Sequence, residues 1–323
     1  MGKNQTRNFI DRKFMENKIA FIIIYYGKIP KYLPIFLESA KKNKHLDFVF
    51  FTDWEKLPVG GANLFNHHLP LSEFNKIAIS KGILHREITY GYKLCDLKPA
   101  WLDILEEYFP EDRYEYVGYI DIDMFLGRTD QYITLDKIRN FDIWTITDSW
   151  ISGAFTLFRN SLKMKHLYKK YKHWNLDFNN PMYSFFDENT FTEIVRDAEK
   201  NGDIKVSRNE STAFQVRPYL LRYVNGQITN ERGDEFICFH YSVAKRYFLW
   251  MLPDWQMMPE EFYINKYGFY ENKENPFTLF KIMTTPKYLK ELIKNIKKGK
   301  GRVFNHLRNS NLKTVLNLIK DQF

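Results

Sequence analysis

The sequence predicts an α/β fold with a mixed central sheet flanked by helices, and three observations carry this prediction. The chain has 323 residues, enough to bury one large core. Residues 19–53 contain an apolar run, a segment with helical spacing and a second apolar run, which is the strand–helix–strand opening of a parallel sheet. A third apolar run, residues 116–127, contains Asp121 and Asp123 and is predicted to form one extended strand.

The opening of the chain contains the elements that start this sheet. A buried strand, a helix, a second buried strand and a short third strand are predicted over residues 19–27, 31–43, 46–53 and 63–69. Ligands of parallel sheets bind at the carboxyl ends of the strands. Tyr25, Gly27 and Asp53 lie at these ends, so we expect them near a bound nucleotide.

The chain contains no glycine-rich phosphate loop. Neither G-x-G-x-x-G nor G-x-x-x-x-G-K-[ST] occurs in the sequence. Their absence argues against a dinucleotide-binding fold and against a P-loop enzyme. Any bound phosphates must therefore be held by a metal ion and by cationic side chains.

Asp121 and Asp123 are the strongest indication of chemistry. Side chains alternate across an extended strand, so both acids should point to the same face while Ile122 points to the other. Two neighbouring carboxylates repel each other and are costly to bury. A divalent cation that carries phosphate oxygens would compensate them. The alternative is a pair of solvated acids at a strand end.

Residues 92–101 lead into a helix that is expected to continue to Tyr108. Lys93 and Asp96 are three residues apart and share one face if this stretch is helical. Two interpretations of the pair stay open, a surface ion pair and a contact to a nucleotide.

The second half of the chain adds further elements and a second group of candidate residues. Strands are expected over 141–147, 152–160 and 236–245, and helices over 162–171 and up to about 200. Asp187 and Glu188 begin the latter helix, where acids are favoured by the helix dipole. The aromatic residues beside them suit a wall of an acceptor pocket: Tyr183, Phe185 and Phe186. The last strand delivers His240, and Lys245 follows five residues later; a histidine at a strand end is either structural or a metal ligand.

Charge and composition bear on partners and location. The net charge of +9 suits phosphorylated ligands, an anionic membrane surface or nucleic acid, but much of the excess lies beyond Pro286. That tail predicts two basic amphipathic helices, which either lie on a membrane or pack on the domain. The N-terminus has no apolar signal core and the chain has no membrane-length apolar run. The two cysteines fit a reducing compartment. We expect a polar lead-in, one catalytic domain and a C-terminal extension over 1–18, 19–252 and 253–323.

Over roughly residues 19–245 the chain resembles a nucleotide-sugar glycosyltransferase of the GT-A type. The resemblance rests on the opening strand–helix–strand, on Tyr119-Ile120-Asp121-Ile122-Asp123-Met124-Phe125 and on His240. Family-8-like transferases later carry a histidine–x–x–glycine–x–x–lysine segment whose histidine completes the metal shell. Residues 240–245 lack that glycine and place the lysine one residue early. The chain looks most like bacterial members associated with surface-polysaccharide (capsule or lipopolysaccharide) synthesis.

This resemblance implies a GT-A, Rossmann-like sheet with a C-terminal helical extension, and a hexosyltransferase activity. It implies Mn²⁺ or Mg²⁺ as cofactor, with Asp121, Asp123 and His240 as ligands. It also implies a nucleotide-sugar donor, UDP-sugar foremost, contacted by Tyr25, Gly27, Asp53, Lys93, Asp96, Asp121 and Lys245. Asp187 or Glu188 would act on a glycan or lipid-linked acceptor, as base in an inverting enzyme or as orienting group in a retaining one. No nucleic-acid partner is expected, and the expected location is the cytoplasm or the inner face of its membrane, reached through the basic tail.

Other functions fit the sequence less well. A phosphohydrolase with an Asp-x-Asp motif is the nearest enzymatic alternative, but such enzymes carry the motif after the first strand and have Thr or Val where this chain has Phe125. A sugar-nucleotide pyrophosphorylase needs a glycine- and arginine-rich loop that residues 26–30 do not provide. A nucleic-acid-binding module lacks any recognised motif here. A non-catalytic carbohydrate-binding protein would explain the aromatic residues but would leave the two aspartates without a role.

Overall fold

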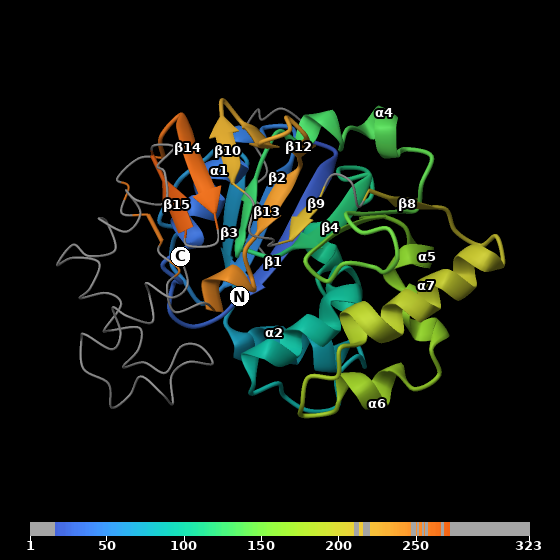
Figure 1. Cartoon of the computed structure of the whole chain (residues 1–323). Helices are drawn as coiled ribbons and strands as arrows, with labels where there is room; N and C mark the ends of the chain where they lie inside the picture. The colour runs from blue at the N-terminus through green and yellow to red at the C-terminus, as the bar shows by residue number, and fades with distance from the viewer. Residues whose placement is uncertain are drawn as a thin grey trace, which may run out of the picture. The chain divides into compact units, whose positions relative to one another are not determined.

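The computed structural model describes residues 17–209, 213–215, 220–246, 250, 252–253, 255, 258–265 and 268–271 (Figure 1). The chain divides into two compact units. The first unit consists of Met1–Pro30, Ala40–Ile122 and Asp130–Glu210. The second consists of Lys31–Ser39, Asp123–Thr129 and Ser211–Phe323. The chain therefore passes from the first unit to the second between Ile122 and Asp123.

The first unit is built on a seven-stranded sheet with the strand order β3-β2-β1-β4-β7-β6-β8. Strand β7 runs antiparallel to β4 and β6, and all other neighbouring strands of the sheet are parallel. The strands are β1 (Ile19–Tyr25), β2 (Asp47–Thr52), β3 (Leu64–His68), β4 (Tyr116–Ile120), β6 (Ile143–Thr145), β7 (Phe155–Arg159) and β8 (Val206–Arg208). The predicted mixed α/β architecture, with a central sheet flanked by helices, is confirmed.

Strands β1 and β2 are interior strands of this sheet, and most of their residues are apolar on both faces. Every residue of β2 is buried, and only Tyr25 of β1 is partly exposed. A parallel strand covered on both faces is stabilised by such continuous apolar runs. The strand–helix–strand opening expected from the sequence is present: β1 and β2 pair in parallel, and α1 (Leu33–Lys42) lies between them in the chain.

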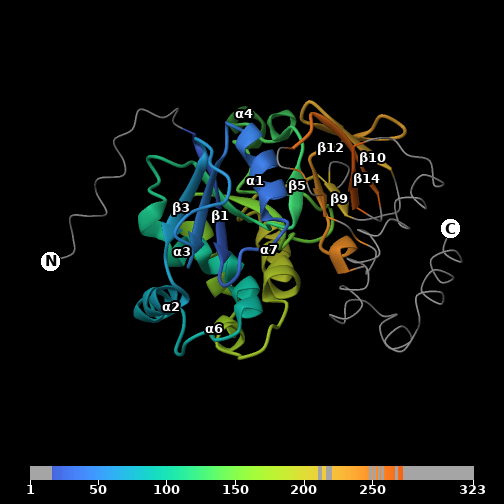
Figure 2. The same cartoon turned by 90° about the vertical axis from the view of Figure 1, so that its left-hand side faces the viewer.

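Helices cover the strands of the first unit. In Figures 1 and 2, α2 and α6 lie below the strands of the first unit. The predicted helix over 162–171 is divided into an α-helical and a 3-10 segment, and the one that reaches residue 200 begins with a π-helical turn. The elements are α2 (Leu71–Ser80), η1 (Gly91–Ala100), α3 (Trp101–Ile104), η2 (Glu106–Tyr108), η3 (Thr129–Gln131), α4 (Leu135–Ile138), α5 (Leu162–Lys165), η4 (Leu167–Lys170), α6 (Trp174–Phe178), η5 (Phe186–Thr190) and α7 (Phe191–Lys200).

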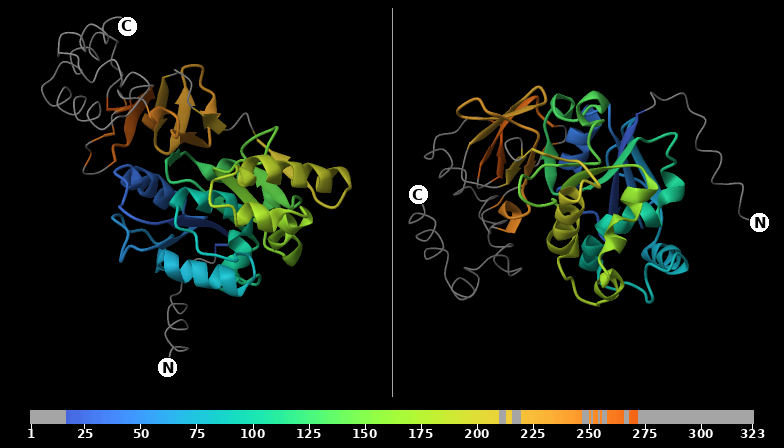
Figure 3. Two further views of the ribbon diagram at one scale, coloured as in Figure 1. Left: turned by 90° about the horizontal axis from the view of Figure 1, so that it is seen from below. Right: turned by 90° about the vertical axis from the view of Figure 1, so that its right-hand side faces the viewer.

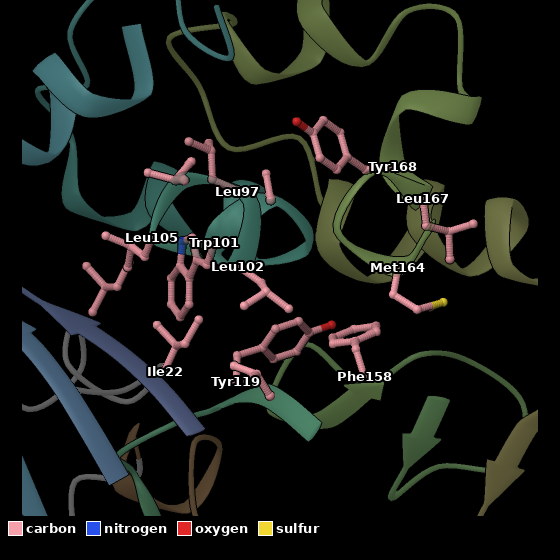
Figure 4. Packing of buried hydrophobic residues seen from close by; sticks show 14 of the residues in the cluster. Ile22, Leu97, Trp101, Leu102, Leu105, Tyr119, Phe158, Met164, Leu167 and Tyr168 are labelled. Atoms are coloured by element: carbon pink, nitrogen blue, oxygen red, sulfur yellow. The ribbon is translucent and has the colours of Figure 1, made fainter. Parts of the chain in front are cut away.

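The main core of the first unit lies between the sheet and helices that include α2, η1 and α3. Figure 4 shows Trp101 and Leu102 pointing toward Ile22 of β1 and Tyr119 of β4. The ring centroids of Trp101 and Tyr119 are 6.3 Å apart in an edge-on arrangement. The ring of Phe158 on β7 continues the cluster, 5.5 Å from that of Tyr119. This packing holds β4, whose end carries the two acids, against its neighbours.

The second unit contains two smaller sheets. One is antiparallel with the order β12-β11-β10-β14-β15, and its strands appear in orange tones in Figure 3. The other has the order β5-β13-β9. The strands are β5 (Met124–Leu126), β9 (Ala213–Gln215), β10 (Leu221–Val224), β11 (Gln227–Asn230), β12 (Glu235–Phe236), β13 (Cys238–His240), β14 (Glu261–Asn265) and β15 (Gly268–Tyr270). Strands β14 and β15 lie in a segment for which the sequence predicted no regular structure.

The prediction of one extended strand over residues 116–127 is wrong. Strand β4 ends at Ile120, the chain bends at Ile122 and Asp123, and β5 begins at Met124 in a different sheet. Asp121 N–H still donates to a carbonyl that precedes β7, whereas the carbonyl of Asp123 accepts from Tyr241 N–H after β13. The two aspartates thus begin separate hydrogen-bonding systems, and strand alternation does not set their orientation.

Several predictions from the sequence fall on other parts of the chain. The polar lead-in, apart from residues 17 and 18, and the basic tail beyond Pro286 lie outside the described residues, so the proposed membrane helices stay a prediction. The expected boundaries at 18–19 and 252–253 stay predictions as well. Among the residues that the structure describes, no helix has the length and apolar character needed to cross a bilayer.

Gly118 in the middle of β4 tests how closely this sheet is packed. A Cβ atom at Gly118 would lie 2.0 Å from the carbonyl oxygen of Thr156 on β7. Because backbone of the paired strand would have to move, we expect Gly118→Ala to lower the free energy of unfolding by about 3 kcal/mol or more. Urea unfolding measures this change. Gly60→Ala is the control, since nothing lies within 4 Å of a Cβ there; equal stabilities of the two variants would contradict the close β4–β7 contact.

Candidate functional site

Asp121 is the first residue after β4 and belongs to the first unit. Its backbone N–H donates to the carbonyl of Ala154 at 2.8 Å, so it is anchored to the segment before β7. Its Oδ1 accepts a hydrogen bond from Lys98 Nζ at 2.7 Å. The side chain of Asp121 is 31% exposed and that of Lys98 only 5%. A partly exposed carboxylate at the carboxyl edge of the sheet therefore rests on a buried cation.

Lys98 was not predicted from the sequence as a site residue. Its ammonium also donates to the carbonyl of Gly153 at 2.5 Å. Burial opposes the charge of Lys98, but Asp121, Cys95 and Asp187 outweigh burial and hold the pKa of Lys98 well above its ordinary value. A charged lysine is thus maintained at the end of η1, where it joins Asp121 to the segment that contains Gly153.

Asp123, His240 and Lys245 come together in the second unit. Strand β13 pairs antiparallel with β5, with His240 opposite Met124, which brings the histidine beside the residue before Met124. His240 Nε2 lies 3.4 Å from Asp123 Oδ1, and Lys245 Nζ lies 2.5 Å from Asp123 Oδ2. The histidine and the aspartate are both buried. The structure therefore brings together two of the predicted metal ligands and the predicted phosphate-binding lysine.

The surroundings of Asp123 keep it ionised. Burial alone would raise its pKa, but the hydrogen bond and charge of His240 and those of Lys245 lower the pKa of Asp123 far below its ordinary value. The carboxylate is therefore ionised at neutral pH. Lys245 is held in place from a second side, with its ammonium 4.9 Å from the ring centroid of Tyr32.

Asp121, Asp123 and His240 form a cluster that could hold a metal ion. One ligand atom from each of the three side chains lies within 4.8 Å of the other two. Two carboxylate oxygens and an imidazole nitrogen are donors of the kind that divalent ions take in proteins. The donor set therefore fits the metal that the sequence predicted.

A second pair of acids lies in the first unit, in the π-helical turn η5 that precedes α7. The carboxylates of Asp187 and Glu188 flank Gly153: Glu188 Oε1 accepts from Gly153 N–H at 3.1 Å. A Cβ at Gly153 would lie 2.5 Å from Asp187 Oδ2 and 3.0 Å from Glu188 Cγ. Only glycine permits this approach, so the small-residue segment before β7 brings the acids close to the carbonyl that Lys98 binds.

Asp187 has the properties of a proton-transfer group. Its side chain is buried, and Tyr183 Oη donates to Asp187 Oδ1 at 3.0 Å. Burial raises the pKa of Asp187 to about 7; the charge of Lys98 opposes this rise and that of Glu188 adds to it. A carboxyl group that titrates near neutral pH can accept a proton from a substrate and later release it.

Lys93 and Asp96 are a buried pair, with side chains 2% and 0% exposed and 2.7 Å between Nζ and Oδ2. Asp96 accepts hydrogen bonds from the backbone N–H groups of Ser184 and Phe186, each at 2.8 Å. Lys93 donates to the carbonyls of Asp177 and Met182 at 2.6 and 3.2 Å. The geometry gives the pair a role in shaping the loop before Asp187. The contact to a donor nucleotide stays a prediction.

Tyr25, Gly27 and Asp53 come together at the carboxyl ends of β1 and β2. Gly27 N–H donates to both carboxylate oxygens of Asp53, at 3.1 and 3.0 Å, and Gly27 has a left-handed backbone with φ of 93°. Trp54, which the sequence analysis did not select, donates its indole N–H to the Gly27 carbonyl at 2.5 Å and lies 5.4 Å from the Tyr25 ring. Trp54 is buried, so this edge offers the partly exposed ring of Tyr25 and the carboxylate of Asp53; the contact to a nucleotide stays a prediction.

A cleft of about 400 Å³ borders Glu188 in the first unit. Its walls include the ring of Trp150 and the charged side chains of Glu193 and Arg196. Arg196 pairs with Glu193 at 2.5 Å and donates to the carbonyl of Ser149 at 2.5 Å. The cleft therefore offers an aromatic surface and polar groups beside one of the two predicted catalytic acids.

A protein-family model matches most of the chain. The profile of a family described as "Family of unknown function (DUF6625)" matches residues 21–264, more than half of the 323 residues. No curated protein matches the chain. The matched range contains all the site residues described above.

The raised pKa of Asp187 predicts a pH-dependent stability. An acid with a folded-state pKa of about 7 and an ordinary value of 3.8 stabilises the fold fully only below pH 3.8, and this contribution is lost as the pH rises toward 7. Asn at this position cannot ionise and keeps an acceptor for Tyr183. We expect Asp187→Asn to be up to about 4 kcal/mol more stable than the wild type above pH 7.

Urea unfolding of both proteins between pH 4 and pH 8 measures the difference. It should be small at the acidic end, grow toward pH 7 and then stay constant. Asp136→Asn, at a side chain that is 94% exposed, is the control and should show no such trend. A stability difference for Asp187→Asn that does not change with pH would contradict the raised pKa.

Proposed function

The chain therefore belongs to this family of unknown function, and we propose from its site that it is a metal-dependent glycosyltransferase of the GT-A type. It would move a sugar from a nucleoside-diphosphate sugar to a hydroxyl group of a glycan or lipid-linked acceptor. The observation that carries the proposal is the cluster of Asp121, Asp123 and His240, which follows a strand of a mostly parallel sheet. The predicted acceptor-side acid, Asp187, adds support because its pKa lies near neutrality.

Asp121, Asp123 and His240 would hold the metal ion, for which Mn²⁺ suits the imidazole better than Mg²⁺ does. When bound, the ion would supply positive charge to the diphosphate of the donor and stabilise the charge that develops on the leaving nucleotide. The pKa of Asp123 lies far below its ordinary value, so this carboxylate is already deprotonated when a cation binds.

The two lysines of the site have complementary parts in this proposal. Lys98 is buried, has two partners and would keep the Asp121 carboxylate in place throughout the reaction. Lys245 is 28% exposed on its side chain and reaches Asp123 from a short 3-10 turn, η7 (Ala244–Arg246). It can turn from the carboxylate to a phosphate oxygen when the donor binds. The absence of a glycine-rich loop is consistent with phosphates held in this way.

Binding of the nucleoside is proposed at the edge formed by Tyr25, Gly27, Asp53 and Trp54. The partly exposed ring of Tyr25 offers a surface for a base, with the buried ring of Trp54 packed beside it, and the Asp53 carboxylate can accept hydrogen bonds from ribose or base. We place the donor's uracil here on the resemblance to UDP-sugar enzymes.

Asp187 would act on the acceptor. In an inverting reaction its carboxylate takes the proton of the acceptor hydroxyl, the oxygen bonds to the anomeric carbon, and the nucleoside diphosphate leaves with the bonding electrons. In a retaining reaction Asp187 would orient the acceptor. Glu188 is held on Gly153 N–H and keeps negative charge beside Asp187, which supports the raised pKa.

Removing the charge of Asp123 tests the metal assignment. We expect Asp123→Asn to lower the rate of UDP release from UDP-sugars by about a hundredfold or more. Replacing a residue that only hydrogen-bonds to a metal ligand already lowers metal affinity or activity about 10–100-fold, and Asp123 would be a ligand itself. Chromatography of UDP released in the presence of Mn²⁺ measures this rate. Asp136→Asn should behave as the wild type. Full metal-dependent release by Asp123→Asn would contradict the proposal.

Metal requirement separates the proposal from its alternatives. We expect His240→Ala to need at least about tenfold more Mn²⁺ for half-maximal donor hydrolysis, since one ligand is lost. Release of inorganic phosphate from phosphate monoesters, with no turnover of sugar nucleotides, would instead indicate a phosphohydrolase. Sugar binding that is indifferent to chelation, again with no turnover, would indicate a carbohydrate-binding protein.

A further inference from the structure

Four aromatic side chains of the first unit form an exposed series that we call the aromatic strip: Tyr90, Tyr92, Tyr183 and Phe185. Tyr90, Tyr92 and Phe185 are 50%, 48% and 53% exposed. Successive ring centroids are 6.3, 4.8 and 4.4 Å apart in the order given. Large apolar side chains gathered on a surface in this way are typical of a binding site.

The backbone at Phe185 shows that the exposure of its ring is imposed by the fold. Phe185 has φ of 61° and ψ of 31°, a left-handed conformation that is strained for a bulky residue. The N–H groups of the residues on either side, Ser184 and Phe186, are both bound by the buried Asp96 carboxylate. The buried ion pair of Lys93 and Asp96 thus stabilises a strained turn, and this turn exposes the ring of Phe185 to solvent.

The aromatic strip leads directly to the proposed catalytic acid. Tyr183, its third member, packs against Tyr92 and Phe185 and donates its hydroxyl to Asp187 Oδ1. Phe186, expected from the sequence to belong to an acceptor wall, is fully buried and is not part of the strip. Tyr90 and Tyr92, some ninety positions earlier in the chain, take its place.

We propose that the aromatic strip binds the acceptor as a chain of sugar rings, so that the acceptor is an oligosaccharide or polysaccharide. This inference rests on the proposed function. Pyranose rings have apolar C–H faces that stack on aromatic rings and hydroxyl groups that bond to phenolic oxygens, and three of the four strip residues are tyrosines. A lipid tail would require a concave apolar channel. A second copy of the chain would need a contact far larger than four rings.

Substitutions of Phe185 should weaken glycan binding without lowering the stability of the protein. Asn and Gly both adopt left-handed backbone readily, so Phe185→Asn and Phe185→Gly remove the ring and relieve the strain. We expect the melting temperature of both variants to equal or exceed that of the wild type. Their binding to a printed array of mono- to octasaccharides should be about tenfold weaker, the effect of losing one ring contact.

Binding by the wild-type protein should strengthen from monosaccharides to tetrasaccharides, because several rings take part, and Tyr92→Ala should weaken it as Phe185→Asn does. Leu162→Asn is the control: Leu162 is 62% exposed but lies on α5 and outside the strip. If the wild-type protein binds glycans but releases no UDP from UDP-sugars, the proposed function is refuted while the assignment of the strip to glycan binding stands.

Three results would overturn the inference. One is the absence of any array signal for the wild type, or an equal signal for Phe185→Asn. The second is a wild-type dimer in light scattering that Phe185→Asn converts to monomer, which would assign the strip to a second copy of the chain. The third is flotation with vesicles that depends on Phe185, which would assign it to a lipid acceptor.

Discussion

Negative charge where β4 ends must be compensated, and the fold provides one lysine for each aspartate. Lys98 binds Asp121 at 2.7 Å in the first unit, and Lys245 binds Asp123 at 2.5 Å in the second. Buried ion pairs contribute little net stability because both charges lose hydration. In the function proposed above, the lysines would instead orient the two carboxylates for a metal ion and a diphosphate.

The positions of these charges follow from backbone pairing. Asp121 continues the pairing of β4 with the segment before β7, whereas the carbonyl of Asp123 accepts from Tyr241 N–H next to β13. The bend between them lets each acid meet its own lysine, and it places Asp123 beside His240. An uninterrupted strand would have aligned the two carboxylates but would not have brought in β13.

The sequence predicted the parts of the fold that depend on local pattern. The buried runs of β1 and β2 and the helix between them were recognisable because continuous apolar residues signal a parallel strand. The break after Ile120 was not recognisable from the sequence. The residues on both sides of the two acids are apolar, and a bend does not change the alternation of apolar and polar residues. Strands β14 and β15 were missed because their aromatic residues also suit irregular segments.

The candidate site was predictable where the local pattern of the sequence marks its residues. The Asp-x-Asp pair and the strand that delivers His240 could be identified from residue type and spacing. Lys98 could not, because its partners lie 23 and 55 positions away. The one available signal was its place directly before Pro99, at the point where η1 leads into α3. The spacing of Lys93 and Asp96 indicated a pair, but only the structure shows that it is buried and binds the loop around Phe185.

Several features near Asp187 lower the stability of the folded protein, so stability does not explain why they are present. A buried acid with a pKa of about 7 opposes folding at neutral pH, and the left-handed backbone of Phe185 stores strain. Gly153 adds conformational entropy to the unfolded chain, yet any side chain there would displace the acids. Such costs concentrate at functional sites. Their coincidence around one carboxyl group is the physical reason to place the acceptor chemistry there.

The most direct test of the account is the position of a bound metal ion. A crystal soaked with Mn²⁺ and UDP would show the ion by its anomalous scattering. The account predicts one anomalous peak within coordination distance of Asp121, Asp123 and His240, with a diphosphate oxygen completing the shell and Lys245 Nζ turned toward the phosphates. UDP bound with no peak at these three residues, or a peak coordinated elsewhere, would contradict it.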